Sequence, residues 1–146
     1  MKKIYFLFLI AAMAAPLFSS GQCKNFVKKK CAPQLEGYIP SDKYNSLRMV
    51  EGEEAEMYLV FVANHDYRIV ICSQDILGDI EFEIMTDQGQ VIFSSADSEG
   101  VKSFDFSTAS TEKLHVVIRV PENESASGMM HEGCVTVMIG SHSLGL

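Results

Sequence analysis

Alternation of apolar and polar side chains is the feature that most limits how this chain can fold. From Ser46 onward, apolar residues recur at every second position, and short groups of turn residues interrupt the pattern at close intervals. A period of two is typical of β-strands, whose successive side chains point to opposite faces. The segments with this pattern are residues 47–50, 55–63, 67–72, 80–85, 90–94, 101–106, 114–120 and 134–140. Seven or eight short strands without crossover helices predict an all-β fold, an antiparallel β-sandwich with Greek-key or jelly-roll connections.

The segment before these strands follows a different period. From Cys23 to Cys31 the apolar and cysteine side chains recur at helical spacing, lysines fill most other positions, and Pro33 ends the pattern. We therefore predict a short amphipathic N-terminal helix packed on one sheet, with its lysines on a solvated face. Such a cover explains why several strands are apolar on both faces. The outer-face residues that we expect beneath the helix are Val70, Cys72 and Met138.

The first residues have the order of a secretory signal. Two lysines precede an apolar run from Ile4 to Phe18, and small or polar residues follow, with cleavage expected after Gly21. A rival interpretation makes Cys23 the lipidated first residue of a lipoprotein. The preceding Gln22 and the odd number of cysteines left over disfavour it. The run is also shorter than the roughly 20 apolar residues that span a bilayer, so no transmembrane segment is expected after cleavage.

Three parts of the chain follow from these patterns. Residues 1–21 form the signal peptide, residues 22–45 the N-terminal helix and a linker, and residues 46–146 the sandwich domain. We expect the mature chain to be exported and to be periplasmic, associated with the outer membrane, or secreted.

The four cysteines, Cys23, Cys31, Cys72 and Cys134, are expected to form two disulfides, because small exported domains rarely keep free thiols. In a continuous helix Cys23 and Cys31 would lie about 12 Å apart, beyond the roughly 7 Å between α-carbons that a disulfide tolerates. Both would then bond to the sheet. The alternative pairs Cys72 with Cys134 across neighbouring strands and closes Cys23 to Cys31 in an irregular loop. Both connectivities stay open at this point.

Charge limits the partners that the chain can bind. The whole chain has a formal net charge of −7, and removing residues 1–21 leaves 10 basic side chains against 19 acidic ones, a net charge of −9. Phosphate-rich surfaces attract lysine and arginine. The acidic balance therefore disfavours nucleic acids and anionic membranes as partners.

Catalytic and metal motifs are missing from the sequence. It contains no HExxH, GxSxG, phosphate-loop or dinucleotide pattern. Met129-Met130-His131 offers only three mixed ligands for copper, which favours a flexible loop instead. The pair Glu81 and Glu83 is placed on a solvent face by alternation, where carboxylates serve solubility. We predict no catalytic residues, no cofactor and no metal site, and hence no enzyme.

The function that remains is a non-catalytic binding or assembly module of the bacterial envelope or extracellular space, with a protein or a glycan as its partner. One alternative is a calcium- or carbohydrate-binding module, and another is a small hydrolase with an unrecognised site. The residues that the first alternative would use are the loop acids Asp75, Asp79 and Asp87 and the aromatics Tyr38 and Tyr44.

Several strands also carry a family resemblance. The runs Tyr67–Ile71, Asp79–Ile84, Asp87–Ile92, Leu114–Val120 and Gly133–Val137 are similar to bacterial pre-peptidase C-terminal domains, over residues 46–140. That resemblance implies a small jelly-roll-like sandwich with a role in secretion, adhesion or ligand binding. The segment from Cys23 to Cys31 departs from the pattern of that family. With its four cysteines, the whole chain also resembles small exported bacterial proteins of unassigned function.

Overall fold

A computed structural model describes residues 21–97, 102–122 and 128–144 of the chain, so the predicted signal peptide lies almost wholly outside it. The described residues form nine strands in two antiparallel sheets, which confirms the predicted all-β sandwich. The strands are β1 (Ile39–Pro40), β2 (Asn45–Val50), β3 (Glu54–Phe61), β4 (His65–Ser73), β5 (Glu81–Thr86), β6 (Val91–Ser94), β7 (Ser103–Thr108), β8 (Glu112–Arg119) and β9 (Glu132–Ser143). The strand beyond the predicted eight is β1, which has only two residues and so cannot show an alternation.

The two sheets differ in their strand order. Sheet A has the order β1-β9-β4-β7, and β2 also pairs with β9. Sheet B has the order β3-β8-β5-β6, so β3 and β6 are its edge strands. Apart from β1–β2 and the β5–β6 hairpin, consecutive strands belong to different sheets. The chain thus crosses repeatedly over one shared core.

The core between the sheets is built from the inward faces that alternation predicts. Inward side chains from both sheets are almost completely buried, because facing sheets exclude water from their inner faces. The largest of them are Phe61, Ile69, Ile71, Leu77, Phe82, Ile84, Leu114 and Ile118.

The β5–β6 hairpin closes through a glycine turn. The Gly89 amide donates to the Thr86 carbonyl over 2.9 Å, and Gly89 has a φ of +83°, which an L side chain rarely adopts. The register shifts between Ile84 and Met85, as a bulge beside such a turn requires.

The predicted helix is present, but its type changes along its length. Helix α2 (Gly21–Phe26) continues as a π-helical turn (Val27–Cys31) and a 3-10 turn (Ala32–Leu35). We call residues 21–35 the helical segment. Pro33 was expected to end it, which is wrong: proline lies near the start of the 3-10 turn, where its missing amide hydrogen costs little. The lysines of the segment are exposed, as predicted.

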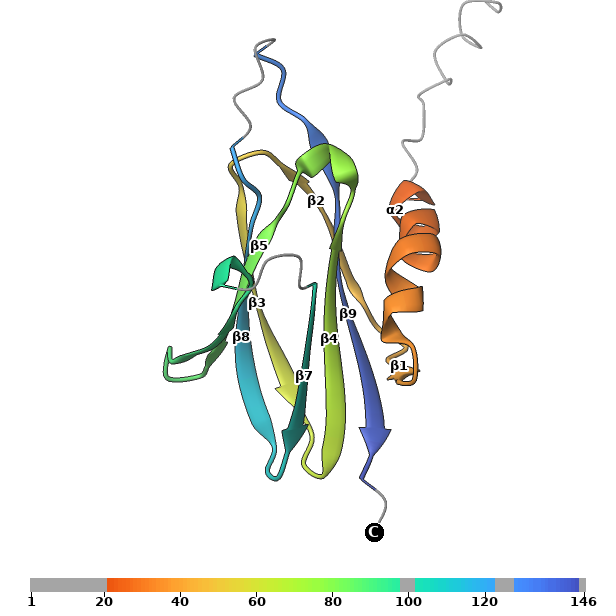
Figure 1. Ribbon diagram of the computed structural model, residues 1–146, viewed down its shortest axis with the longest axis vertical. Coiled ribbons are helices and arrows are strands. Elements are labelled where there is room, and N and C mark those ends of the chain that lie inside the picture. Colours follow the sequence, from red (N-terminus) through yellow and green to blue (C-terminus); the bar gives the residue numbers. More distant parts are fainter. Residues whose placement is uncertain (1–20, 98–101, 123–127, 145–146) are drawn as a thin grey trace, which may run out of the picture.

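The helical segment packs on the outer face of sheet A. Figure 1 shows α2 beside β4 and β9, on the side of that sheet away from β3 and β8. Its buried side chains repeat every four residues and close over the expected outer-face residues of β4 and β9. The resulting cluster consists of Val27, Cys31, Leu35, Val70, Cys72 and Met138. Sheet A therefore has a second, smaller core on its outer side.

Two features fix the end of the helical segment. On β9, a Cβ added to Gly140 would lie 2.6 Å from the Cβ of Tyr38, so only glycine admits this approach. On β4, Arg68 binds both carboxylate oxygens of Asp105, at 2.7 and 2.6 Å, and donates to the carbonyls of Gln34 and Glu36. Arg68 thus ties the last turn of the segment to sheet A.

Candidate binding surface

The outer face of β3 carries a row of exposed apolar side chains. Tyr58, Val60 and Val62 are 57%, 67% and 56% exposed, whereas Leu59 and Phe61 between them point into the core. The sequence shows this second apolar face, and the helical segment was expected to cover faces of that kind. It covers the outer faces of β4 and β9 but not that of β3. We call Tyr58, Val60 and Val62 the β3 row.

Neighbouring side chains on β8 hold the first member of the row in place. The Tyr58 ring stacks on His115 with 4.5 Å between ring centroids, and the Lys113 ammonium lies 4.4 Å from the Tyr58 centroid. His115 is held in turn by Glu56, 3.1 Å from its Nε2. These contacts restrain an exposed aromatic ring, so presenting it to a partner costs little side-chain entropy.

Among the strands that the structure describes, β3 pairs only with β8. Its eight residues pair with β8 in a continuous antiparallel register from Glu54 to Phe61. Because alternate peptide groups of a strand point to opposite sides, the outer edge of β3 presents amides and carbonyls that sheet B does not use. The β3 row therefore lies beside a backbone edge that can accept another strand.

A groove continues the row towards sheet A. It has a volume of about 420 Å³ and lies between the end of β3 and the residues of β1. Val60, Phe61 and Ile39 line it, and the exposed Asp42 is its acidic residue. A groove of mixed polar and apolar lining with one acidic residue suits a chain segment that carries a basic side chain.

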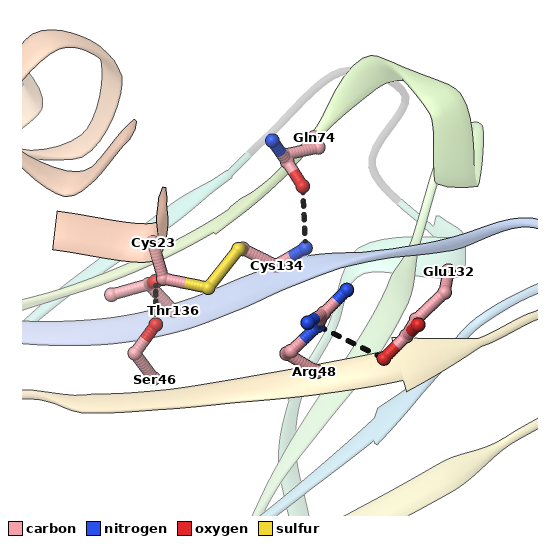
Figure 2. The surroundings of a disulfide bond; sticks show 7 residues. All are labelled: Cys23, Ser46, Arg48, Gln74, Glu132, Cys134 and Thr136. Atoms are coloured by element: carbon pink, nitrogen blue, oxygen red, sulfur yellow. Dashed lines mark hydrogen bonds and ion pairs between the residues drawn. A yellow bond between two sulfur atoms is a disulfide. The ribbon is translucent and has the colours of Figure 1, made fainter. Parts of the chain in front are cut away.

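The cysteines lie at the opposite side of the molecule. A disulfide joins Cys23 of α2 to Cys134 of β9, with 5.7 Å between their α-carbons (Figure 2). This is one helix-to-sheet bond of the two that the first predicted connectivity contains. Beside it, the Gln74 side chain accepts a hydrogen bond from the Cys134 amide over 2.8 Å. Cys31 and Cys72 are free thiols in the structure, and both are buried.

A second hollow opens beside the helical segment. It has a volume of about 400 Å³, and its walls come from the segment, from the end of β4 and the residues after it, and from Lys102 just before β7. Cys72 lines it, together with Lys30, Lys102 and Gln34. Sequence reasoning missed this hollow, because no spacing rule relates residues of a helix to strands that follow 40 and 70 positions later.

The residues proposed for calcium or sugar binding do not come together. Asp87 forms an ion pair with Lys113 at 3.3 Å. Within residues 21–97, 102–122 and 128–144, no group of three or more His, Cys, Asp or Glu side chains is placed to hold a metal ion. Tyr38 is half-buried: Arg68 lies 4.6 Å from its ring centroid, and the tilted His142 ring lies 4.6 Å away between centroids. Tyr44 alone is exposed as expected.

The other candidate groups have local partners. Glu81 is exposed, and Glu83 accepts a hydrogen bond from Arg119 over 3.0 Å, on the outer face that alternation predicts. His131 of the Met129-Met130-His131 run contacts Glu51 at 2.6 Å. In the described part of the chain, every helix is too short and too polar to cross a membrane.

Comparisons with known proteins find similar folds among solved structures. Neither a protein-family model nor a curated protein matches the chain. Among solved structures, the chain is similar to PliG from Aeromonas hydrophila, a periplasmic lysozyme inhibitor of g-type lysozyme. The likeness covers 73% of this chain and 89% of that one, with 9% sequence identity and a TM-score of 0.49. Values this low carry no argument about function, and the resemblance to pre-peptidase C-terminal domains stays a prediction.

Proposed function

We propose that this chain is exported and acts as a non-catalytic binding module that holds an extended segment of a basic protein along strand β3. The observation that carries the proposal is the β3 row, three large apolar side chains left in water, two on edge strand β3 and the third, Val62, directly after it. Monomeric β-proteins normally protect such edges with charges, proline or a bulge. The first half of β3 has Glu54 and Glu56, but the second half has no such protection.

The geometry suits a partner that adds a strand. Backbone groups along the open edge of β3 would supply the hydrogen bonds, and alternate side chains of the partner would contact the β3 row. Tyr58 is the expected anchor, because it is aromatic and its ring is held by His115 and Lys113. The groove beside Val60 would hold the next part of the segment, with Asp42 facing a lysine or arginine.

Charge supports a basic partner. The net charge of −7, or −9 after loss of residues 1–21, gives the molecule a negative field that attracts cationic proteins and repels anionic ones. The electrostatic part of the attraction is screened by salt, so we expect association to slow as ionic strength rises.

Export is supported by two features. The first residues have the order of a secretory signal. The Cys23–Cys134 disulfide is the kind of bond that persists in an oxidising compartment. A module outside the cytoplasm would meet basic proteins of the envelope or of the surroundings.

Site-specific photo-crosslinking tests the proposal. A photoreactive amino acid is placed at Val62, and the mature chain is irradiated with the envelope and secreted fractions of its own organism. The matched control carries it at Ile92, an exposed apolar residue on β6, the other edge of sheet B. We expect one crosslinked protein of net positive charge from Val62 and none from Ile92.

A substitution in the same experiment ties the crosslink to the β3 row. Val60→Lys adds a like charge opposite a basic partner, so the Val62 crosslink should fall by about tenfold or more. Equal crosslinking from Val62 and Ile92, or a crosslink that Val60→Lys leaves unchanged, would contradict the proposed surface.

A further inference from the structure

Two thiols meet between the helical segment and sheet A. Cys31 comes from the π-helical turn and Cys72 from β4, and both belong to the cluster that holds the segment on the sheet. The two side chains share a hydrogen bond, and the Gln34 amide donates to Cys72 Sγ over 3.5 Å. The helix and the sheet therefore hold these sulfurs side by side. Cys31 follows Cys23 of the existing disulfide by eight residues.

The two thiols differ in access. Cys72 lines the hollow of about 400 Å³, whereas Cys31 is not among the residues that line it. Cys31 has no exposed surface at all. A reagent that enters the hollow therefore meets Cys72 first, and Cys31 lies behind it.

The two thiols also differ in acidity. The hydrogen bond from Cys31 lowers the pKa of Cys72, against the effect of burial, and the positive charge of Lys102 lowers it further. The same hydrogen bond and burial raise the pKa of Cys31. Since the thiolate is the reactive form of cysteine, Cys72 is the nucleophile of the pair.

The charged residues that line the hollow favour an anionic ligand. Lys30 and Lys102 both line it, and Asp75 is the acidic residue among its walls. This positive balance stands out on a chain whose overall charge is strongly negative. A small anionic molecule is favoured here over a cationic one of the same size.

We propose that Cys72 is the attacking thiol and Cys31 the resolving thiol in a second helix-to-sheet disulfide, formed by exchange with a small anionic disulfide that enters the hollow. The Cys72 thiolate attacks one sulfur of the oxidant, the oxidant's S–S bond breaks, and one thiol leaves with a proton. Cys31 then gives up its proton and attacks Cys72 Sγ, so the mixed disulfide breaks and the second thiol leaves. Two electrons pass from the protein to the oxidant, which is released as two thiols.

Glutathione disulfide is the probe for the test, applied to protein whose Cys23–Cys134 bond is intact. The Cys31→Ser variant should keep one glutathione on Cys72, found by mass spectrometry of the digested protein. The Cys72→Ser variant should acquire glutathione on Cys31 about tenfold more slowly or not at all, because that thiol is enclosed and more basic. Equal rates at the two cysteines would overturn the assignment.

The wild-type chain gives a second readout that does not depend on how the serine variants fold. Quenching with N-ethylmaleimide at short times should trap a mixed disulfide on Cys72. At long times the chain should contain a Cys31–Cys72 bond and no glutathione. A first adduct on Cys31, or two persistent thiols after prolonged exposure, would contradict the proposal.

Charge selectivity has its own control. Cystamine is a small disulfide that carries positive charges. The ratio to measure is the rate of reaction with glutathione disulfide divided by the rate with cystamine. This ratio should be higher for the wild-type chain than for a thiol in a neutral peptide. Lys102→Gln should reduce this ratio by about threefold, since one of the two cations at the hollow is lost. A ratio that Lys102→Gln leaves unchanged would show that the hollow does not select its disulfide by charge.

Discussion

The outer faces of β4 and β3 look alike in sequence but have opposite surroundings in the folded chain. On β4, Val70 and Cys72 are almost completely buried beneath the helical segment. On β3, Tyr58, Val60 and Val62 point into water. An apolar outer face must be shielded from water, and on sheet A the helical segment of the same chain does this. For β3 it supplies none within the described residues, which is why we assign that face to a partner.

The largest expected effect comes from breaking the disulfide that joins the helical segment to sheet A. Cys23→Ser removes a disulfide that spans 111 residues of sequence. A loop of this length corresponds to about 4–5 kcal/mol in the chain-entropy account. Urea unfolding should show a loss of that size, whereas Lys24→Ser on the exposed side of α2 should change the stability by less than about 0.5 kcal/mol. A small loss of stability in Cys23→Ser would mean that packing alone holds the helical segment on sheet A.

A matched pair of truncations compares the two faces directly. Leu35→Ala empties a buried position between the helical segment and sheet A and should cost about 3 kcal/mol. Val60→Ala shortens an exposed side chain and should cost less than about 0.5 kcal/mol. Chemical denaturation of the two variants measures both values. Similar losses would show that the isolated chain already covers the β3 row.

The close approach at Gly140 is expected to have an intermediate effect. Gly140→Ala places a Cβ against Tyr38 and Leu35, so the junction between the helical segment and β1 must shift, at a cost of about 1–3 kcal/mol. Ser141→Ala, its neighbour on β9, serves as the control. Thermal unfolding should separate the two variants, and equal melting temperatures would argue against a tight junction.

The smallest effect is electrostatic. Hydrogen bonds from Arg68 hold the pKa of Asp105 below its usual value. The pair therefore stabilises the fold above the unfolded-state pKa of Asp105, about 3.9, and that contribution is lost as the pH falls through the lower folded value. Because the pair is partly exposed, it should contribute less than about 1 kcal/mol. In Asp105→Asn, the free energy of unfolding should lose this part of its dependence on acid pH. A variant whose stability follows the same pH profile as the wild-type chain would contradict the role given to the Arg68–Asp105 pair.

The sequence predicts the parts of the fold that depend on local periodicity. Alternation places Phe82, Ile84 and Ile118 inward, and helical spacing places Val27 and Cys31 against the sheet. Both predictions succeed because burial of one face imposes the period of the element on its residues.

What the sequence leaves open depends on long-range pairing. The two residues of β1 lie against β9 because Gly140 leaves room for Tyr38, a contact across 102 positions that no local pattern encodes. No local pattern predicts that Arg68 binds the end of the helical segment. The Cys23–Cys134 bond and the hollow beside Cys72 also depend on how the helical segment packs on sheet A. The β3 row was visible as a pattern, but its exposure depends on where the helical segment lies.

Amide hydrogen exchange on the isolated mature chain, and on the chain bound to the protein crosslinked through Val62, tests the central claim most directly. We predict that amides of β3 gain protection in the complex while those of β6 exchange at unchanged rates, because the partner adds a strand at one edge of sheet B. Protection that appears at β6, or none at β3, would contradict the assignment of this edge to a partner.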